Sequence, residues 1–316
     1  MIEKIKVGIS ACLLGMKVRY DGEHKLDPYL KNTLGQYVEW IPVCPEVEMG
    51  LPIPREPLRL VGDPKSPSLV TVKSGKDLTN QMKKWAEQKL EELAKEDLCG
   101  FVFKSKSPSS GMRSVKVYGK SGIPSRTGIG IFAHAFMDKF PLIPVEDEGR
   151  LYNPELRENF IERLFVFHRW KKMIQKEALI KNLISFHTKH KLLILAHSPK
   201  HYKILGKLVA EFSKYKNKDI FTEYLSLLME GLKLIATKNK NTNVLLHIMG
   251  YFKKQLTEKE KKELLNLIES YHKGLLPLIV PVVLLQHYAS KFEQQYFLEQ
   301  YYLSPFPLEL MLRNHV

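Results

Sequence analysis

The segment Ile5-Lys-Val-Gly-Ile-Ser-Ala-Cys-Leu-Leu-Gly15 decides the interpretation of the first half of this chain. Ile5 to Ser10 is short and apolar, as expected of a strand buried in a parallel sheet. Val38 to Val43 has the same character, and a helical pattern from Leu78 to Leu98 leads into a third strand at Gly100 to Phe103. This alternation predicts an α/β N-terminal domain with a mainly parallel sheet.

Two further elements complete this domain. A glycine-rich turn, Thr127 to Gly130, is expected to open a helix that runs to about Asp138, and the short apolar run Leu142 to Val145 follows it. The polar segment Glu146 to Arg150 then marks a change of pattern. We therefore expect one domain at residues 1–150 and a second at 151–316.

The second domain has apolar residues at helical spacing almost without interruption, which predicts an all-α C-terminal domain. Short polar links separate the segments. The predicted helices cover residues 154–178, 179–197, 199–214, 219–237, 241–256, 258–273 and 279–301.

Composition and charge favour a cytoplasmic protein with a polyanionic partner. The start of the chain lacks the apolar core of a signal peptide, and the longest apolar run, Leu275 to Leu285, contains two prolines and is too short to span a bilayer. Nothing in the sequence indicates an obligate protein partner. Residues 151–316 hold 26 Lys and Arg against 15 Asp and Glu, an excess that favours nucleic acid, although basic surfaces without such a partner are common.

Three predicted strands end in loops that carry reactive side chains. The loops are Ser10 to Gly15, Val43 to Gly50 and Lys104 to Gly111, and they contain Cys12, Cys44 and a run of serines. Ligands bind beyond the carboxyl ends of strands in open α/β sheets, so the loops are expected to face one crevice. Glu46 lies close to Cys44. Thiols beside a carboxylate indicate metal or thiolate chemistry, and two cysteines packed as small apolar residues are the alternative. Cys99 precedes its strand and is interpreted as structural.

At these residues the sequence resembles the thiouracil desulfidases over about residues 4–148. The resemblance rests on the Ser-Ala-Cys-Leu-Leu-Gly start, on Val18 to Gly22, Cys44-Pro-Glu46 and Gly50 to Glu56, and on the serine-rich loop. It implies a [4Fe-4S] cluster held by three cysteines, of which Cys12 and Cys44 would be two. It also implies that the open iron takes the sulfur of a thiolated pyrimidine.

The third ligand position departs from the family pattern, because Ser110 stands where Ser-Pro-Ser-Cys-Gly would place a cysteine. A serine oxygen is a harder donor than a thiolate. Three outcomes follow: a cluster with Ser110 or an external third ligand, a cluster that recruits Cys99, or a cluster-free descendant. For hydrolytic desulfuration, the resemblance implies that Glu46 is the general acid/base. Ser107 and Ser109 would orient the pyrimidine or donate a hydrogen bond to its oxygen. Their alternative role is to cap a helix or to form a turn.

Aromatic residues among lysines suggest RNA contacts in the second domain. They occur at His168 to Lys172, Lys214 to Lys218 and Gly250 to Lys254, where rings can stack on bases while cations neutralise phosphate. The alternative is a solvated face beside core aromatics. His187, His190 and His197 lie near one helix face and suggest a metal site, a proton relay, an RNA-contacting edge or plain packing. The candidate RNA-binding residues are Arg169, Lys171, Lys172, Lys253 and Lys254.

The helical half resembles the YbgA-like domain of unknown function over about residues 158–316. The motifs are Phe186 to Leu193, Leu195 to Ser198, His247 to Lys254 and the tail from Tyr302 to Asn314. The pair of domains is similar to bacterial desulfidases that remove 4-thiouridine from tRNA, which implies tRNA as partner and substrate. Two alternatives remain: a cluster-free RNA-binding protein, and a desulfidase of free thiolated pyrimidine bases.

Overall fold

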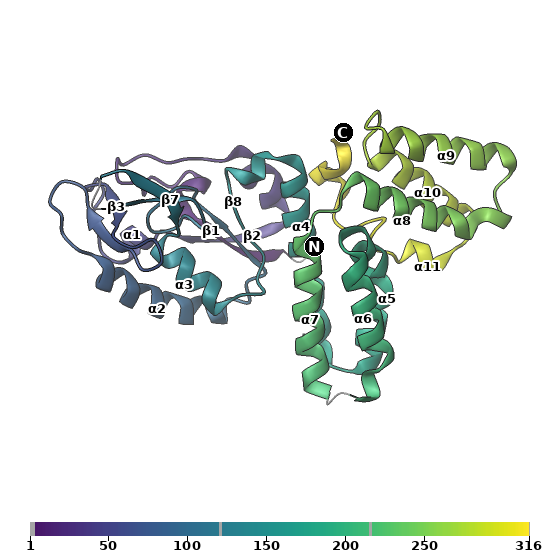
Figure 1. Ribbon diagram of the computed structural model, residues 1–316, viewed down its shortest axis with the longest axis horizontal. Coiled ribbons are helices and arrows are strands. Elements are labelled where there is room, and N and C mark those ends of the chain that lie inside the picture. Colours follow the sequence, from purple (N-terminus) through teal and green to yellow (C-terminus); the bar gives the residue numbers. More distant parts are fainter. Residues whose placement is uncertain (1–3, 120–121, 215–216, 316) are drawn as a thin grey trace. The chain divides into compact units, whose positions relative to one another are not determined.

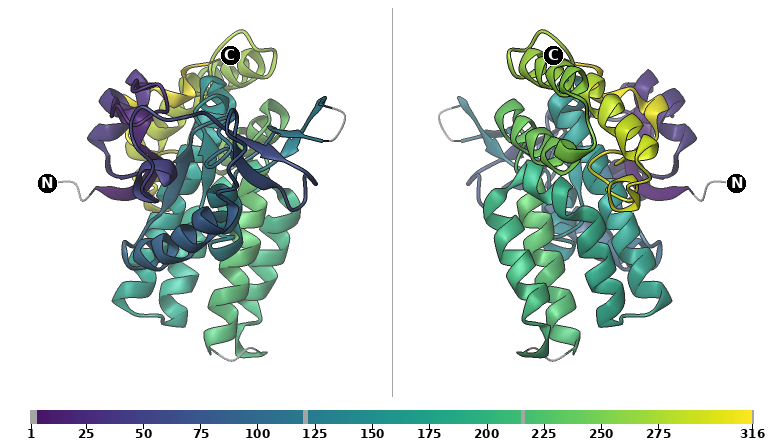
Figure 2. Two further views of the ribbon diagram at one scale, coloured as in Figure 1. Left: turned by 90° about the vertical axis from the view of Figure 1, so that its left-hand side faces the viewer. Right: turned by 90° about the vertical axis from the view of Figure 1, so that its right-hand side faces the viewer.

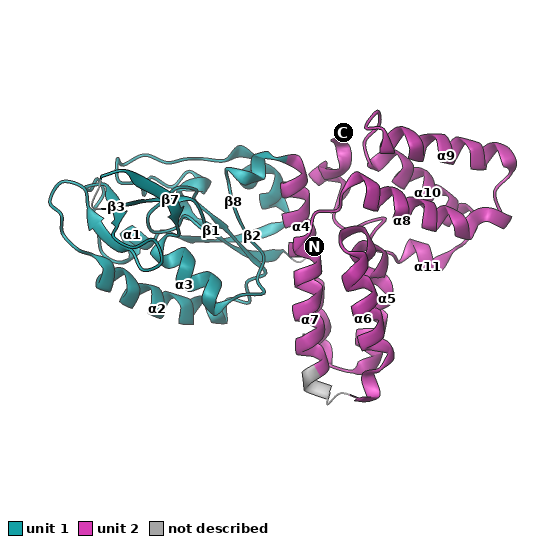
Figure 3. Ribbon diagram, in the orientation of Figure 1, with its two compact units in different colours: residues 1–153 teal, residues 154–316 magenta. Residues whose placement is uncertain are grey.

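The computed structural model describes residues 4–119, 122–214 and 217–315. The chain divides into two compact units, Met1–Asn153 and Pro154–Val316 (Figure 3). The division falls three residues after the boundary expected at residue 150. Each unit is described by itself below.

The first unit is built on a parallel four-stranded sheet in the order β2-β1-β5-β8. Its strands are β1 (Ile5–Ser10), β2 (Val38–Val43), β5 (Gly100–Phe103) and β8 (Val145–Asp147). Parallel pairing places β1 between β2 and β5. All four residues of β5 are buried, which explains why it reads as an unbroken apolar run. The α/β prediction is therefore confirmed.

A second sheet of four short strands was not predicted. Its order is β4-β3-β6-β7, and it mixes antiparallel hairpins with one parallel pair, β3 with β6. The expected glycine-rich turn at Thr127 is instead the end of a strand, although its helix begins close to the expected place. Figure 1 labels two of these strands, whose bounds are β3 (Leu58–Val61), β4 (Ser68–Thr71), β6 (Val115–Tyr118) and β7 (Pro124–Gly128).

Aromatic packing joins the first sheet to helix α3 (Ile131–Lys139), and Trp85 of α2 (Thr79–Lys95) contacts Phe132 of α3. The rings of Phe101 and Phe103 stack with centroids 4.3 Å apart, and Phe136 of α3 contacts both rings. On the neighbouring strand, a Cβ added to Gly8 would lie 2.2 Å from the Phe101 ring. The ring therefore occupies the space that any side chain at position 8 would need.

The second unit is helical, as the sequence predicts. Its helices α5, α6 and α7 run alongside one another (Figures 1 and 2). The segment expected as one helix at 279–301 is broken near Phe292, where α10 ends before the short α11. Within the described ranges, no helix combines the length and apolar character that crossing a membrane requires. The bounds are α4 (Pro154–Lys176), α5 (Ile180–His197), α6 (Pro199–Ala210), α7 (Asn217–Lys233), α8 (Lys238–Tyr251), α9 (Glu258–His272), α10 (Ile279–Lys291) and α11 (Gln295–Leu298).

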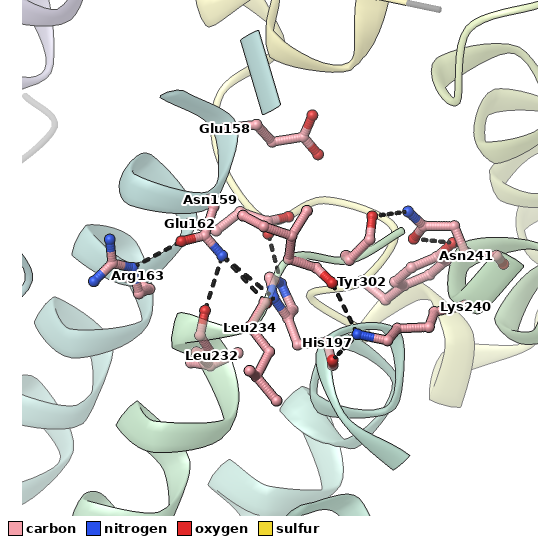
Figure 4. Close-up of polar contacts among 12 residues, drawn as sticks. Glu158, Asn159, Glu162, Arg163, His197, Leu232, Leu234, Lys240, Asn241 and Tyr302 are labelled. Atoms are coloured by element: carbon pink, nitrogen blue, oxygen red, sulfur yellow. Dashed lines mark hydrogen bonds and ion pairs between the residues drawn. The ribbon is translucent and has the colours of Figure 1, made fainter. Parts of the chain in front are cut away.

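A buried ionic cluster ties α4 to α5 and to the C-terminal segment, and Figure 4 shows its contact between Glu162 of α4 and His197 of α5. One Glu162 oxygen lies 2.9 Å from Arg313 Nη2, and the other lies 2.8 Å from His197 Nε2. His197 Nδ1 lies 2.7 Å from the Leu234 carbonyl oxygen, which can only accept a hydrogen bond. Both ring nitrogens of His197 therefore lie within hydrogen-bond distance of oxygen acceptors.

Glu158 belongs to the same cluster and lies 3.2 Å from Arg313 Nε. Burial raises the pKa of Glu158 to about 8, and the charge of Glu162 adds to the rise. Although burial opposes it, the hydrogen bond and charge of His197 lower the pKa of Glu162. Glu162 is thus the ionised partner, and Glu158 holds its proton near neutral pH.

Gly8→Ala tests the packing of β1 against Phe101. The new methyl group collides with the ring, so the free energy of unfolding should fall by about 1–3 kcal/mol in denaturant titrations. Gly119→Ala is the control, because a Cβ there meets nothing within 4 Å. Equal stabilities for the two variants would show that the ring moves aside.

Glu158→Gln tests the cluster through pH. The folded state favours protonated Glu158, so its contribution to stability is complete below the ordinary pKa and is lost as pH rises through about 8. Between about pH 5 and about pH 9, the native chain should lose stability relative to Glu158→Gln in equilibrium unfolding. The exposed Glu263→Gln should follow the native chain. Parallel curves for all three proteins would contradict the assignment.

Candidate functional site

The loops after β1, β2 and β5 line one cavity of about 390 Å³. Its walls include Cys12, Cys44 and Ser110, together with Glu46 and the serines of the third loop. The cavity is within the usual size range of small-molecule sites. The structure thus brings together the candidate ligands and catalytic residues that the sequence places on three separate loops.

Cys12 and Cys44 are each held by a tight turn at the end of the preceding strand. Cys12 lies in a 3₁₀ turn that directly follows β1 and ends at Gly15, whose φ of 90° is the left-handed conformation that glycine permits. Cys44 caps the short helix α1 (Pro45–Glu48), and its amide donates to Glu48 Oε1 at 2.7 Å. These turns fix both thiols at the carboxyl ends of the parallel strands.

The serine loop is docked on the start of α3. The amide of Phe132 donates to the Ser109 carbonyl at 3.0 Å, and the amide of Gly130 donates to the Gly111 carbonyl at 2.7 Å. A Cβ at Gly130 would lie 2.6 Å from the Ser109 backbone, so only glycine allows this approach. Amides that would otherwise lack partners at a helix start therefore fix Ser109 and Ser110.

Glu46 and two serines form a hydrogen-bonded chain. Ser109 Oγ donates to Glu46 Oε1 at 2.9 Å, and Ser107 Oγ lies 3.0 Å from Ser109 Oγ. Because the Ser109 proton points to the carboxylate, Ser107 must be the donor in the second contact. The chain runs from Ser107 through Ser109 to Glu46, which is an arrangement suited to moving a proton along the cavity wall.

Arg55 is a site residue that the sequence analysis did not select. Its Nη2 and Nε lie 2.6 and 2.9 Å from Glu46 Oε2, and Nη2 also donates to the Val18 carbonyl at 2.9 Å. The guanidinium joins the loop after β1 to α1 and leaves the other Glu46 oxygen for Ser109. One signal for Arg55 was available in the sequence. Arg55 directly follows Pro-Ile-Pro, in a segment that carries the family resemblance.

Lys104 and Glu148 form a second ion pair at the cavity, and Glu148 also accepts from the Ser105 amide at 2.6 Å. Burial raises the pKa of the Cys12 thiol to about 11, while the positive charge of Lys104 opposes the rise. Burial also raises the pKa of Cys44. Both cysteines are therefore protonated thiols near neutral pH unless a cation binds beside them.

The donor set suits an iron–sulfur cluster at two of three positions. Cys12 and Cys44 offer soft sulfur, whereas Ser110 offers a harder oxygen on the third loop. Among the described residues, no group of three His, Cys, Asp or Glu is placed to hold a metal ion. Cys99 is buried before β5 and does not line the cavity. A cluster at this place would therefore use Ser110 or an external group as its third ligand.

In the helical unit, the structure separates the candidate RNA-binding residues. Lys253 and Lys254 are exposed, whereas Lys171 and Lys172 are half-buried. Arg169 is half-buried, and its guanidinium lies 3.7 Å from the centroid of the Tyr301 ring and donates to the Pro305 carbonyl. Burial lowers the pKa of Arg169 to about 10. These contacts tie the arginine to the C-terminal segment.

The aromatic residues beside these lysines also differ in how far they are buried. Trp170 is buried, with its ring stacked on Tyr224 at a centroid distance of 5.5 Å, so it belongs to the core. Tyr251 is 57% exposed and adjoins Lys253 and Lys254. Of these two patterns, the one at Gly250 to Lys254 offers an exposed ring for base stacking. Part of the Lys214–Lys218 pattern lies outside the described residues.

The three histidines of α5 are buried and have different partners. His187 Nδ1 lies 3.0 Å from the Tyr224 hydroxyl, and burial lowers the pKa of His187 to about 4. His190 Nδ1 lies 2.7 Å from the Phe186 carbonyl, and His197 contacts Glu162 as described above. Plain packing is the interpretation that their surroundings favour over a metal site or an RNA-contacting edge.

Comparison with known proteins identifies both units. Residues 7–148 match the family model of 2-thiouracil desulfurase, and residues 191–307 match a model described as a protein of unknown function (DUF1722). The uncharacterized protein YbbK of Bacillus subtilis is 27% identical over 108 residues, which are 33% of this chain and 71% of YbbK. A solved structure of the [4Fe-4S]-dependent thiouracil desulfidase TudS is 33% identical, covers 47% of this chain and 94% of its own, and has a TM-score of 0.39.

The uncharacterized protein YbgA of Escherichia coli is 30% identical over 153 residues, which are 48% of this chain and 90% of YbgA. That coverage extends over most of the relative. The chain therefore belongs to the family of Escherichia coli YbgA and carries a 2-thiouracil desulfurase domain at residues 7–148.

Proposed function

We propose that the first unit removes sulfur from thiolated uracil with the help of an iron–sulfur cluster, and that its substrate is 4-thiouridine in tRNA. The observation that carries the proposal is the convergence of Cys12, Cys44 and Ser110 in one cavity whose wall also holds the Glu46–Ser109 pair. Family membership of the domain supports the reaction class.

Cys12 and Cys44 would hold the cluster, with Ser110 at the third position. When bound, the cluster would supply an iron with affinity for the sulfur of the base and with Lewis acidity. Water replaces sulfur at the ring carbon, so the products are the ordinary carbonyl base, hydrosulfide and one proton. Glu46 takes a proton from the attacking water and returns it to the departing sulfur, and the second proton of the water passes to Glu46 as the carbonyl forms.

Contacts along the cavity wall support this exchange. Arg55 fixes one oxygen of Glu46, so the other oxygen keeps its contact with Ser109. Ser107 and Ser109 extend the proton path along the cavity wall. Lys104 brings a positive charge near Cys12, which favours negative charge on sulfur.

The choice of tRNA rests on the second unit. Its excess of basic residues favours a polyanion, and Lys253 and Lys254 present their charges next to the exposed ring of Tyr251. A desulfidase of free bases would have no use for such a unit. A comparison of desulfidation rates on thiolated tRNA and on free 4-thiouracil distinguishes the two candidate substrates.

The first test concerns the ligands. After anaerobic purification, Cys12→Ala and Cys44→Ala should contain little iron and acid-labile sulfide, because each removes a soft donor. Cys99→Ala is the matched control and should keep the native content. Ser110→Cys should raise iron content per chain and increase the loss of near-ultraviolet absorbance from thiolated tRNA.

Two results would contradict the ligand assignment. Equal iron loss in all three cysteine variants would overturn the choice of Cys12 and Cys44. Iron-free preparations of both the native chain and Ser110→Cys would favour a cluster-free RNA-binding protein. Unchanged iron content in both Ser110→Cys and Ser110→Ala would remove position 110 from the site.

The second test concerns proton transfer. Glu46→Gln cannot accept a proton, so desulfidation should slow by about 100-fold or more while iron content stays at the native level. The exposed Glu23→Gln should keep the native rate. A native rate in Glu46→Gln would exclude this carboxylate as the acid/base.

A further inference from the structure

Three rings gather at the surface of the helical unit, where side chains of α8 meet side chains of α11. Tyr251 of α8 is 57% exposed, and the centroid of its ring lies 6.4 Å from that of Tyr296 on α11. The ring of His247, one turn earlier on α8, is also exposed and lies 5.3 Å from the Tyr251 ring. We call these three residues the aromatic cluster. A tyrosine that served only the core would bury its ring, as Tyr224 and Tyr302 do.

The neighbours of the aromatic cluster hold it in place. The buried ring of Phe297 packs against Tyr251, with centroids 5.1 Å apart. Just after α11, Glu299 pairs with Lys189 of α5 at 3.2 Å, and the Tyr301 amide donates to the Lys189 carbonyl at 2.9 Å. These contacts fix α11 to both α5 and α8. A ligand that binds rings already held in place loses little free energy in ordering them.

Positive charge lies next to the aromatic cluster. Lys191 Nζ lies 4.9 Å from the centroid of the Tyr296 ring. Lys253 and Lys254 are exposed and closely follow Tyr251 in the chain. Aromatic residues also bind organic cations, but these lysines would repel such a ligand. The ligand that suits both the rings and the charge is an anion with a planar ring, which is the chemistry of a nucleotide.

The form of the nucleic acid follows from the exposed rings. In a duplex, each base is stacked between its neighbours, so its face cannot lie against a protein ring. An unpaired base can leave the stack and place its face on a tyrosine. Because stacking does not depend on the edge of a particular base, we expect binding without strong sequence preference. Exposed rings therefore select single-stranded nucleotides over duplex.

We propose that the aromatic cluster binds an unpaired nucleobase of RNA, while Lys253 and Lys254 neutralise the phosphates beside it. The inference rests on the proposed function for the identity of the polynucleotide as RNA. It goes further by assigning the contact to single-stranded nucleotides and by adding Tyr296 and His247 to the site. The helical unit would then hold its RNA at a loop or an end, where unpaired bases occur.

Binding of the full chain to a single-stranded probe tests the aromatic cluster without turnover. The probe is an oligouridylate that carries one 2-aminopurine, whose fluorescence falls when the base stacks. Tyr251→Leu/Tyr296→Leu removes both tyrosine faces, so affinity should fall about 5- to 150-fold and the quenching should disappear. Tyr152→Leu is the matched control, because it removes a ring that is 71% exposed outside the cluster, and it should bind as the native chain does.

Salt dependence and a conservative variant separate stacking from other losses. The leucine variant removes no phosphate contact, so its slope of log affinity against log salt should stay native, whereas Lys253→Gln/Lys254→Gln should reduce the slope by about 1.4. Tyr251→Phe/Tyr296→Phe keeps both ring faces and should retain most of the native affinity. Thermal unfolding checks that each variant is folded. Tyr251→Leu alone, at the more exposed position, replaces the double variant if that one does not fold.

Three results would overturn the aromatic cluster as a base site. They are native affinity in the folded leucine variant, an equal loss of affinity for the same strand annealed to its complement, and a phenylalanine variant that binds as weakly as the leucine variant. Failure of the proposed function gives a different result. A chain that binds the probe through the cluster without desulfidating thiolated tRNA would overturn the proposed reaction alone.

Discussion

Parallel pairing of β1 with β2 on one side and β5 on the other is the constraint on which the candidate site depends. Parallel strands bring their carboxyl ends to one edge of the sheet, so three loops far apart in sequence meet there. The pairing in turn depends on Gly8, because the Phe101 ring fills the space beside it. The aromatic core and the thiol cavity are consequences of the same close packing.

Around this edge, polar contacts rather than apolar packing set the positions of the reactive side chains. Arg55 joins the first two loops through Glu46 and Val18, while Ser109 links the third loop to the same carboxylate. The start of α3 then holds the backbone of the third loop. Glu46 is therefore the residue at which all three loops meet.

Much of this arrangement follows from the sequence, and the remainder has physical reasons. The strand at Gly100 is a continuous apolar run and the strand at Ile5 is mostly apolar, and the positions of the loops after them follow from topology. The second sheet was missed because its four strands have only four or five residues each and expose polar side chains such as Lys116 and Arg126. The partners of Arg169 were not predicted, because local charge does not reveal that a ring and a carbonyl lie opposite it in the fold.

The ionic cluster of the helical unit has a consequence for the order of synthesis. Glu162 and Arg313 are 151 residues apart, and Arg313 follows every helix of the unit. At elongation rates of about 5 to 20 residues per second, Glu162 is made roughly 8 to 30 s before its arginine partner. During that interval the buried position of Glu162 lacks one of its two side-chain partners. The nascent helical unit is therefore expected to stay loosely packed around α4 until the arginine emerges, whereas the desulfurase domain has every partner it needs much earlier.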